Sequence, residues 1–178
     1  LNDRLRRLDG PAVLVSDSQT TAARAVHAAS FAASPLVPGL LMTLFTATSP
    51  AGLTPEITLD GFPAPIHFSS PTQVNFQVPY ALAGRSSAAL EFRLGGQLID
   101  RLLLPVAPAA PAFFEHGPVR GQVLAVLPNG ELHSETNPAR PGDVVVLYAT
   151  GEGLRTERNG FEVPFLPVAV EINGLPAE

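Results

Sequence analysis

The residues best suited to catalysis or metal binding are few and widely spaced. Four histidines stand far apart and form neither an H-x₃-H nor an H-E-x-x-H pattern: His27, His67, His116 and His133. A zinc site would therefore have to be assembled entirely by the fold. Cysteine is absent, so the chain has no thiolate metal ligand and no thiol nucleophile. We expect no metal and no cofactor.

A hydroxyl, an imidazole and a carboxylate do occur near one another, as Ser69 or Ser70, His67 and Asp60. These are the residue types of a hydrolase triad. The G-x-S-x-G context of a nucleophilic serine is missing, and all of these residues lie in one run of short strands. Roles in turns and strands are therefore favoured. We expect that the protein is not an enzyme, and a hydrolase is the least favoured function.

Acidic residues gather in one region of the second half, at Asp143, Glu152, Glu157 and Glu162. The D-x-[DN]-x-[DN]-G pattern of a calcium loop is absent there. A calcium site would need ligands that the fold brings together at the end of a sandwich, and the sequence leaves this alternative open.

Three residues are candidates for contact with a ligand. Asn75 lies between Val74 and Phe76, so it either binds a ligand from the wet face of a strand or hydrogen-bonds the backbone of a neighbouring loop. The second interpretation is favoured. Tyr80 and Tyr148 are candidate aromatic contacts for a sugar. The sequence has no tryptophan, which weakens a carbohydrate-binding function.

Composition limits the class of partner. Of the 178 residues, 46% are hydrophobic, which is enough to fill a core. The 11 basic residues are all arginines against 16 acidic residues, and the formal net charge is −5. A nucleic-acid backbone needs clustered cations, so we expect no nucleic-acid partner. No apolar run approaches the roughly 18 residues that span a bilayer, and we expect no membrane insertion.

The elements that must position these residues are short strands. The 19 prolines and 15 glycines interrupt the chain too often for long helices. Residues 57–80 have the clearest pattern: a strand, a turn at Asp60 and Gly61, a second strand, a break at 69–71, and a third strand. In that third strand apolar and polar residues alternate. The alternation predicts an antiparallel strand with one buried and one wet face.

Further strands follow from apolar runs and from alternation. Gly95-Gly96 and Asn129-Gly130 each predict the turn of a hairpin. The alanine-rich residues 21–34 allow either a short helical turn or an edge strand. The predicted strands outside 57–80 are 40–47, 87–94, 97–106, 122–127, 131–134, 143–149 and 168–172.

An internal repeat indicates how these strands are organised. Residues 107–111, APAAP, are too rich in proline for a central strand and are typical of a stiff, extended linker. On either side of it, 34–39 (SPLVPG) correspond to 137–142 (NPARPG), and 60–64 (DGFPA) correspond to 173–177 (NGLPA). The repeat predicts two copies of one strand meander.

The second copy stops before the counterpart of residues 66–107. A sandwich unit without its last strands exposes apolar faces and unpaired strand edges. Three explanations stay open, in order of preference. The chain is an excerpt of a longer one, or the second unit is short and packs on the first, or another chain donates the missing strands.

Two resemblances add to this interpretation. Residues 2–9, NDRLRRLD, resemble the end of an NHL-type propeller repeat, N-x-R-[IL]-R-[RK]-[VIL]-D. That resemblance implies that residues 1–24 are the remnant of a preceding propeller domain. Judged by charge alone, the arginines of this segment are expected on a solvated strand or turn.

The second resemblance covers residues 25–178. It is carried by the segments AVHAASFAASPLVPGLLMTLF, DGFPAPIHFSSPTQVNFQVPY, VAPAAPAFF, NPARPGDVVVLYATGEG and VEINGLPAE. The chain is similar to the Solibacter-type uncharacterised C-terminal domain of secreted bacterial proteins, which implies an immunoglobulin-like, secreted or cell-surface (extracellular or periplasmic) module without catalytic residues to transfer. In that family the chain normally continues past the counterpart of Glu178. This chain departs from the family pattern at His27, where Asn is usual, and at 45–48, where a Gly-containing turn is usual.

These observations predict an all-β, immunoglobulin-like β-sandwich protein with two related units in tandem, the second incomplete. The predicted boundaries are 25–107 for the first unit, 108–112 for the proline-rich linker and 113–178 for the second unit. The favoured function is a non-catalytic structural or adhesive module that contacts other domains of the same chain, surface proteins or glycans. The alternative is a glycan- or small-ligand-binding module that uses loops at one end of the sandwich.

Overall fold

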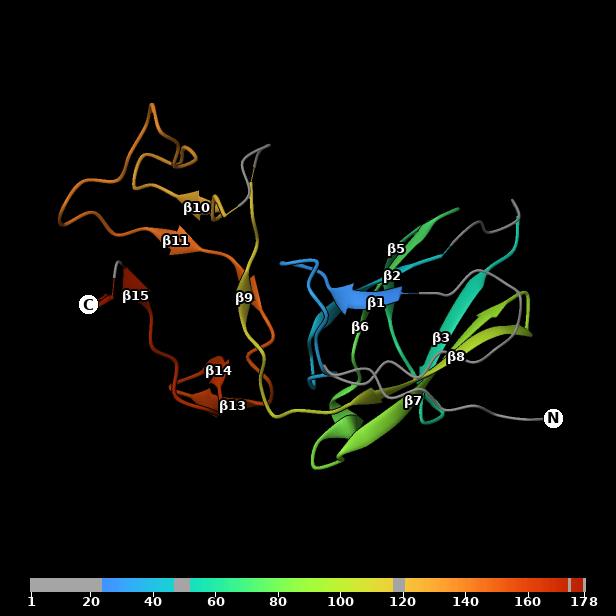
Figure 1. Ribbon diagram of the computed structural model, residues 1–178. Coiled ribbons are helices and arrows are strands. Elements are labelled where there is room, and N and C mark those ends of the chain that lie inside the picture. The colour runs from blue at the N-terminus through green and yellow to red at the C-terminus, as the bar shows by residue number, and fades with distance from the viewer. Residues whose placement is uncertain (1–23, 47–51, 117–120, 173, 178) are drawn as a thin grey trace.

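The computed structural model describes residues 24–46, 52–116, 121–172 and 174–177 (Figure 1). Within them the regular elements are β-strands, apart from one 3₁₀ turn, η1 (Tyr80–Leu82), so the predicted all-β class is confirmed. The resemblance of residues 2–9 to a propeller repeat lies outside the described residues. The strands of the first half are β1 (Arg24–His27), β2 (Leu41–Phe45), β3 (Pro55–Leu59), β4 (Phe62–Pro63), β5 (Ile66–Ser70), β6 (Gln73–Gln77), β7 (Ser87–Leu94) and β8 (Gln97–Pro105). Those of the second half are β9 (Ala112–Phe113), β10 (Ala125–Val126), β11 (Val146–Leu147), β12 (Ala149–Thr150), β13 (Arg155–Arg158), β14 (Phe161–Pro164), β15 (Glu171–Ile172) and β16 (Leu175–Pro176).

The strands of the first half form two antiparallel, four-stranded sheets. One has the order β1-β2-β6-β5 and the other the order β4-β3-β7-β8. Figure 1 shows these strands grouped together on one side of the molecule and the second half on the other. A single core takes apolar side chains from both sheets, so the first half is sandwich-like. Its buried members are Leu36, Val37, Leu40, Met42, Leu44, Ile57, Leu59, Ala64, Val74, Phe76, Val78, Leu82, Ala88, Leu90, Phe92, Leu94, Leu102 and Leu104.

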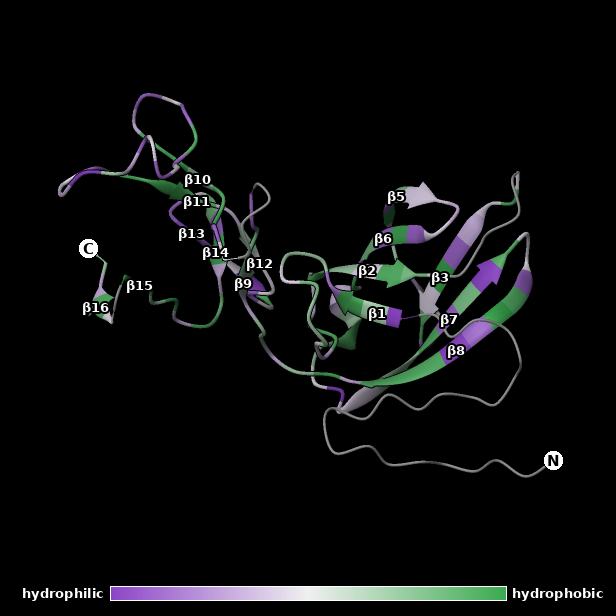
Figure 2. Cartoon of the chain, turned by 45° about the horizontal axis from the view of Figure 1, so that its top comes forward, coloured by the Kyte–Doolittle hydropathy of each residue, from purple (hydrophilic) through white to green (hydrophobic). Residues whose placement is uncertain are grey.

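Alternation along the strands decides which side chains enter this core. In β6, Val74 and Phe76 are buried, whereas Gln73, Asn75 and Gln77 are partly exposed. The same alternation continues along the whole of β7, and Figure 2 shows β7 as alternating hydrophobic and hydrophilic bands. Successive side chains of a strand point to opposite faces, so the buried members of both strands face one interior. The one-sided burial predicted for 73–78 is confirmed.

The predicted turn at Asp60 and Gly61 is also confirmed. Both residues have positive φ, 49° and 82°, as a two-residue turn between antiparallel strands requires. The sequence predicted a single strand between this turn and the break at 69–71. The chain instead forms two strands there, β4 in one sheet and β5 in the other. Pro63 and Pro65 flank this crossover between the sheets. The hairpin of β7 and β8 forms around Gly95 and Gly96 as predicted.

In the alanine-rich stretch, Arg24–His27 form the edge strand β1, and residues 28–30 form a turn that is closed by the bond from Phe31 N–H to His27 O. β1 pairs with β2, with Ala25 opposite Leu44 and Val26 opposite Thr43. Tertiary pairing therefore overrides the helix propensity of alanine. Phe31, in the loop that follows, has φ 52°, which is an uncommon conformation for a bulky side chain.

Strand pairing in the second half is shorter than predicted. The predicted continuous strand 143–149 divides into β11 and β12, and the hairpin predicted around Asn129 and Gly130 reduces to β10 and isolated bridges such as Val126 to Leu132. Each sheet of this half has two strands. Short pairs bury little apolar surface, and two-stranded ladders are marginal in water.

One turn has the same backbone hydrogen bond in both halves. Leu40 N–H donates to Val37 O at 2.9 Å, and Asp143 N–H donates to Arg140 O at 3.0 Å. The glycine within each turn, at 39 and 142, has a positive φ of 83° and 91° respectively. The repeated segments SPLVPG and NPARPG therefore adopt the same turn.

One hairpin also has the same register in both halves. Leu59 pairs with Phe62 across the β3–β4 turn, and Ile172 pairs with Leu175 across the β15–β16 turn. These four residues occupy equivalent positions in the repeated segments around DGFPA and NGLPA.

The proline-rich segment is extended and is fixed at both ends. Ala107 N–H donates to Leu36 O, and Ala110 N–H donates to Gly151 O, each at 2.9 Å. Ala107 and Ala110 also pack against the core of the first half. Ala112 already belongs to β9, so the extended segment ends one residue before the predicted boundary at 112.

The enclosed core predicts a large difference between two phenylalanines of neighbouring strands. Phe76→Ala should lower the free energy of unfolding by about 3–5 kcal/mol, because Phe76 is fully buried between the sheets. Phe68→Ala on β5 is the matched control, since Phe68 is 50% exposed, and it should cost less than about 1 kcal/mol. Urea unfolding followed by circular dichroism measures both. Equal losses would contradict a single core between the two sheets.

Candidate functional site

The two halves contact one another at a network of hydrogen bonds, which we call the joint (His27, Leu41, Ala110, Thr150 and Gly151). His27 Nε2 lies 3.1 Å from Ala110 O. Leu41 N–H donates to Thr150 Oγ1 at 3.1 Å, and Ala110 N–H donates to Gly151 O at 2.9 Å. These bonds connect the ends of β1 and β2 to the extended linker and to the end of β12.

The joint holds the His27 ring in one tautomer. Ala29 N–H donates to His27 Nδ1 at 3.1 Å, so Nδ1 is an acceptor and the proton lies on Nε2, which donates to Ala110 O. His27 is 2% exposed, and burial lowers its pKa below the ordinary value of 6.5. The bonds to the backbone of Ala110 and Thr150 oppose that shift. Protonation at Nδ1 would place two donors against each other at Ala29.

Two glycines allow the second half to approach the linker this closely. A Cβ on Gly151 would lie 2.2 Å from Ala110 O and 3.2 Å from His27 Nε2. A Cβ on Gly153 would lie 2.0 Å from Pro108 O. Both glycines also have positive φ, 97° and 86°. The segment ATGEG is therefore shaped by backbone contact with the linker.

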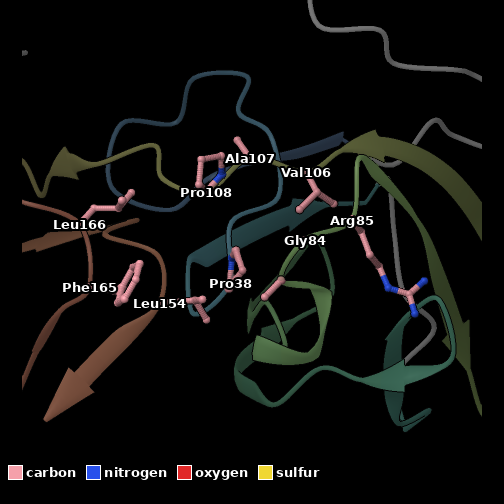
Figure 3. A pocket seen from close by; sticks show the side chains of 10 residues that line it. Pro38, Gly84, Arg85, Val106, Ala107, Pro108, Leu154, Phe165 and Leu166 are labelled. Carbon is pink, nitrogen blue, oxygen red and sulfur yellow. The ribbon is translucent and has the colours of Figure 1, made fainter.

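A small apolar cavity of about 250 Å³ lies beside the joint (Figure 3). Leu154, Phe165 and Leu166 line it from the second half. The first half and the linker contribute Pro38, Ala83, Gly84, Arg85, Val106, Ala107 and Pro108. Its surface suits an apolar group and offers one charged side chain.

That charge is already engaged. Arg85 Nη1 donates to Asp60 Oδ2 at 2.6 Å, and its guanidinium lies 5.4 Å from the centre of the Phe62 ring. Figure 3 shows the guanidinium pointing away from Leu154 and Phe165. Arg85 therefore stabilises the β3–β4 turn, and the cavity has no free polar group from Arg85 with which to orient a ligand.

Asn75 lies on the partly exposed face of β6. Its Oδ1 accepts hydrogen bonds from Thr43 Oγ1 at 3.0 Å and from Gln73 Nε2 at 2.8 Å. The bond to Thr43 forms because the register places Thr43 directly opposite Asn75. The favoured interpretation, a bond to the backbone of a neighbouring loop, stays a prediction. A ligand-binding role for Asn75 stays a prediction.

The two candidate tyrosines lie in different halves of the chain. Tyr80, in η1, covers Gly39, where a Cβ would lie 2.5 Å from its hydroxyl. The pKa of Arg155 is raised, chiefly because the guanidinium donates to Glu152, with smaller contributions that include Tyr80. Tyr148 lies between β11 and β12 and is 47% exposed. Among the described residues, the aromatic rings that pair are those of Phe31 and Phe45, whose centroids lie 6.1 Å apart.

The residues considered as a hydrolase triad lie in different sheets and make different contacts. Asp60 accepts from Arg85 and, through its other oxygen, from Ala89 N–H at 2.8 Å, both at the turn of one sheet. His67 and Ser69 are exposed on β5, in the other sheet. These positions favour the predicted turn and strand roles.

Three of the acidic candidates in the second half have local partners. Arg155 pairs with Glu152 at 2.6 Å and with Glu162 at 3.5 Å, and Asp143 accepts from Arg140 N–H at 2.8 Å. His116 and His133 stand on either side of β10 in the sequence, and their backbone N–H groups donate to Gln122 O and Ala125 O. In the part of the chain that the structure describes, no three histidine or acidic side chains are placed to hold a metal ion.

The second half exposes apolar side chains to an extent that the first does not. Leu59 is fully buried, whereas Ile172, at the equivalent position of the second hairpin, is 57% exposed. Val144 is the most exposed of the large apolar residues, at 80%. We call the set the apolar surface of the second half: Val144, Val146, Tyr148, Leu154, Phe161, Phe165, Leu166, Val168, Ile172 and Leu175.

Two strands of the second half that correspond to central strands of the first have an edge without a partner among the described residues. β2 lies between β1 and β6, whereas β11 pairs with β10 alone. Similarly, β3 lies between β4 and β7, whereas β15 pairs with β16 alone. The repeat in the sequence predicted such edges. The joint, by contrast, was not predicted. The closely spaced Gly151 and Gly153 were the sequence signal that could have indicated a close backbone contact there.

No family model, curated protein or solved structure matches this chain. Among the described residues, no helix has the length and apolar character needed to cross a membrane.

The contact at Gly151 predicts a substitution effect beyond backbone strain. Gly130 has a positive φ of 81° with open space around it, so Gly130→Ala should cost only the left-handed strain of about 1–2 kcal/mol. Gly151→Ala should cost more, by the roughly 1–3 kcal/mol typical of overpacking against Ala110. Urea unfolding of the two variants measures the difference. Equal costs would show that the joint does not constrain position 151.

The pKa of His27 predicts a pH dependence. Because the folded-state pKa lies below 6.5, the unfolded chain binds more protons between that pKa and 6.5, and stability rises with pH across the window. The stabilisation by neutral His27 is therefore complete above about pH 7 and is lost as the pH falls from 6.5 to the folded-state pKa.

Unfolding free energies at pH 5 to 8 test this expectation in His27→Gln, with exposed His67→Gln as the control. Between pH 5 and 7 the His27 variant should show a shallower dependence than the unsubstituted chain, and the His67 variant should follow the unsubstituted chain. If the unfolding free energy of His27→Gln depends on pH as steeply as that of the unsubstituted chain, the titrating group is another residue.

Proposed function

We propose that the protein is a non-catalytic structural or adhesive module of two related immunoglobulin-like units, and that it acts by binding another polypeptide segment through its second unit. One observation carries the proposal: apolar positions that are enclosed in the first unit are exposed in the second, as at Leu59 and Ile172. A secreted or cell-surface location, implied by the resemblance described above, is part of the proposal.

The relation between the units is supported by equivalent strand pairs. In the first, Ala25 and Val26 pair with Leu44 and Thr43. In the second, β10 and β11 pair in the same way, Ala125 with Leu147 and Val126 with Val146. The shared turn and the shared hairpin register described above point in the same direction. The two four-stranded antiparallel sheets of the first unit fit an immunoglobulin-like arrangement.

The energetics favour a protein partner. Burying one large aliphatic or aromatic side chain is worth about 1.5–3 kcal/mol, and the apolar surface of the second half contains several such residues. Large apolar side chains exposed in such number are a feature of surfaces that bind a partner. The candidate catalytic groups, Asp60, His67 and Ser69, lie in separate sheets, which supports a non-catalytic module.

A second candidate function, glycan or small-ligand binding by loops, is favoured by one further observation. A pocket of about 380 Å³ lies between loops of the second half and has a mostly polar lining. Asn129 Nδ2 and Asn137 Nδ2 both donate to Glu131 Oε2 beside it. Amide and carboxylate groups of this kind hydrogen-bond sugar hydroxyls.

The proposal predicts that the chain binds an apolar dye through its second half. The fluorescence of 1-anilinonaphthalene-8-sulfonate should rise on mixing with the chain, because the dye binds exposed apolar surface. Val144→Ser combined with Phe161→Ser should remove most of the increase, since both side chains are more than 70% exposed. Phe31→Ser combined with Phe68→Ser, in the first half, is the matched control and should leave most of it. The opposite ranking would contradict the proposal.

A further inference from the structure

The unpaired edge of β11, which we call the β11 edge (residues 143–148), has the geometry of a strand acceptor. We propose that the second unit binds an extended polypeptide strand antiparallel to β11, with apolar residues at every second position. This inference rests on the proposed function and names the chemistry and the place of the partner.

Alternate residues of the β11 edge direct their backbone groups away from β10. Tyr148 N–H donates to Leu124 O on the side of β10 and β9. Successive N–H groups of a strand point to opposite edges, so those of Val145 and Leu147 point to the edge where the described chain has no strand. A strand that pairs there would satisfy these donors and acceptors.

The first unit shows what occupies the equivalent edge. β2 pairs on that side with β6, with Met42 opposite Phe76, Thr43 opposite Asn75 and Leu44 opposite Val74. The repeat places Val145, Val146 and Leu147 at the positions of these three β2 residues. The partner strand is therefore expected to have apolar residues opposite Val145 and Leu147 and a residue tolerant of water opposite Val146.

Side-chain burial agrees with this register. Met42 and Leu44 are fully buried under β6 and the opposite sheet, whereas Val145 and Leu147 are only partly buried. Ala125, on the neighbouring strand β10, is buried, with only 8% of its surface exposed. A small buried group thus exists beside β11, and an added strand with alternating apolar residues would extend it.

Apart from Asp143 at its start, the β11 edge lacks the features that keep other edges from pairing. The outer strand β8 contains Asp100 and Arg101, and its pairing with β7 is bulged. The outer strand β5 is bulged between Ile66 and Phe68. Residues 144–148, VVVLY, contain no charge and no proline. Charges, prolines and bulges are the usual protection of sheet edges, so β11 is a ready template for strand addition.

The test uses the full 178-residue chain and a synthetic peptide of residues 71–80, which contains the β6 sequence. In β6, Val78 N–H donates to Leu40 O of the neighbouring β2 segment, whereas Gln77 N–H donates to Pro65 O on the β5 side. By alternation, Phe76 N–H also points toward β2. A peptide N-methylated at Phe76 therefore loses a bond to the acceptor edge, and one N-methylated at Gln77 does not.

Amide exchange, measured by NMR, reads out the binding site. With saturating peptide, exchange at Val145 and Leu147 should slow at least about tenfold, the scale of one or more backbone bonds. Methylation at Phe76 should weaken binding at least about tenfold, and methylation at Gln77 should have much less effect. Unchanged exchange at Met42 and Leu44 confirms that the peptide has not displaced β6.

Three results would overturn the inference: no slowing at Val145 and Leu147 with millimolar peptide, equal effects of the two methylations, or protection that appears without peptide and rises with protein concentration. The last result would assign the β11 edge to a second copy of the chain. Peptide binding elsewhere on the apolar surface would leave the proposed function intact and reject strand addition alone. Loss of dye binding to that surface would reject the proposed function itself.

Discussion

Enclosure of apolar sheet faces is the constraint on which the rest of the structure depends. In the first unit, β2 and β6 cover one side of the core while β3 and β7 cover the other, and the side chains between them exclude solvent. Each buried large side chain contributes about 1.5–3 kcal/mol, so a complete pair of sheets is self-sufficient. In the relation that we propose between the halves, β10, β11, β15 and β16 correspond to β1, β2, β3 and β4, and the described residues contain no counterpart of β6 or β7. On that proposal, the exposed apolar residues of the second half and the unpaired β11 edge follow from the difference.

The joint determines how the second unit is attached. It relies on backbone contacts among Ala110, Thr150 and Gly151, where side chains larger than hydrogen at 151 would not fit. His27 closes the network as a neutral donor and acceptor, and its burial makes this contact sensitive to protonation. These contacts therefore fix the geometry of the attachment, although the second half buries few apolar side chains. A module that presents a binding surface needs such an attachment to hold the surface in place.

Much of the fold could be predicted because local patterns record which face of a strand is buried. The alternation in 73–78 and 87–94 and the turn at Asp60 and Gly61 led directly to β6, β7 and the β3–β4 hairpin. The crossover from β4 to β5 was not predictable in this way, because period and composition do not say to which sheet a strand belongs. The strand predicted at 143–149 was too long, since apolar composition alone does not supply pairing partners.

The candidate site was less predictable, because its contacts join residues far apart in sequence. His27 and Ala110 meet through tertiary packing, and neither residue has a local pattern that indicates the other. Asn75 was expected to bond a loop, and the cross-strand register gives it Thr43 as a partner. The internal repeat was more informative, because the first unit serves as a template for what the second lacks. That comparison identified the β11 edge.

We propose that equivalent edges of the two halves are closed in the first and open in the second. Native-state amide exchange of the 178-residue chain alone measures this difference. We expect strong protection at Met42 and Leu44, whose amides face β6, and fast exchange at Val145 and Leu147, whose amides face the unpaired β11 edge. Comparable protection at the two pairs in the monomeric chain would contradict it.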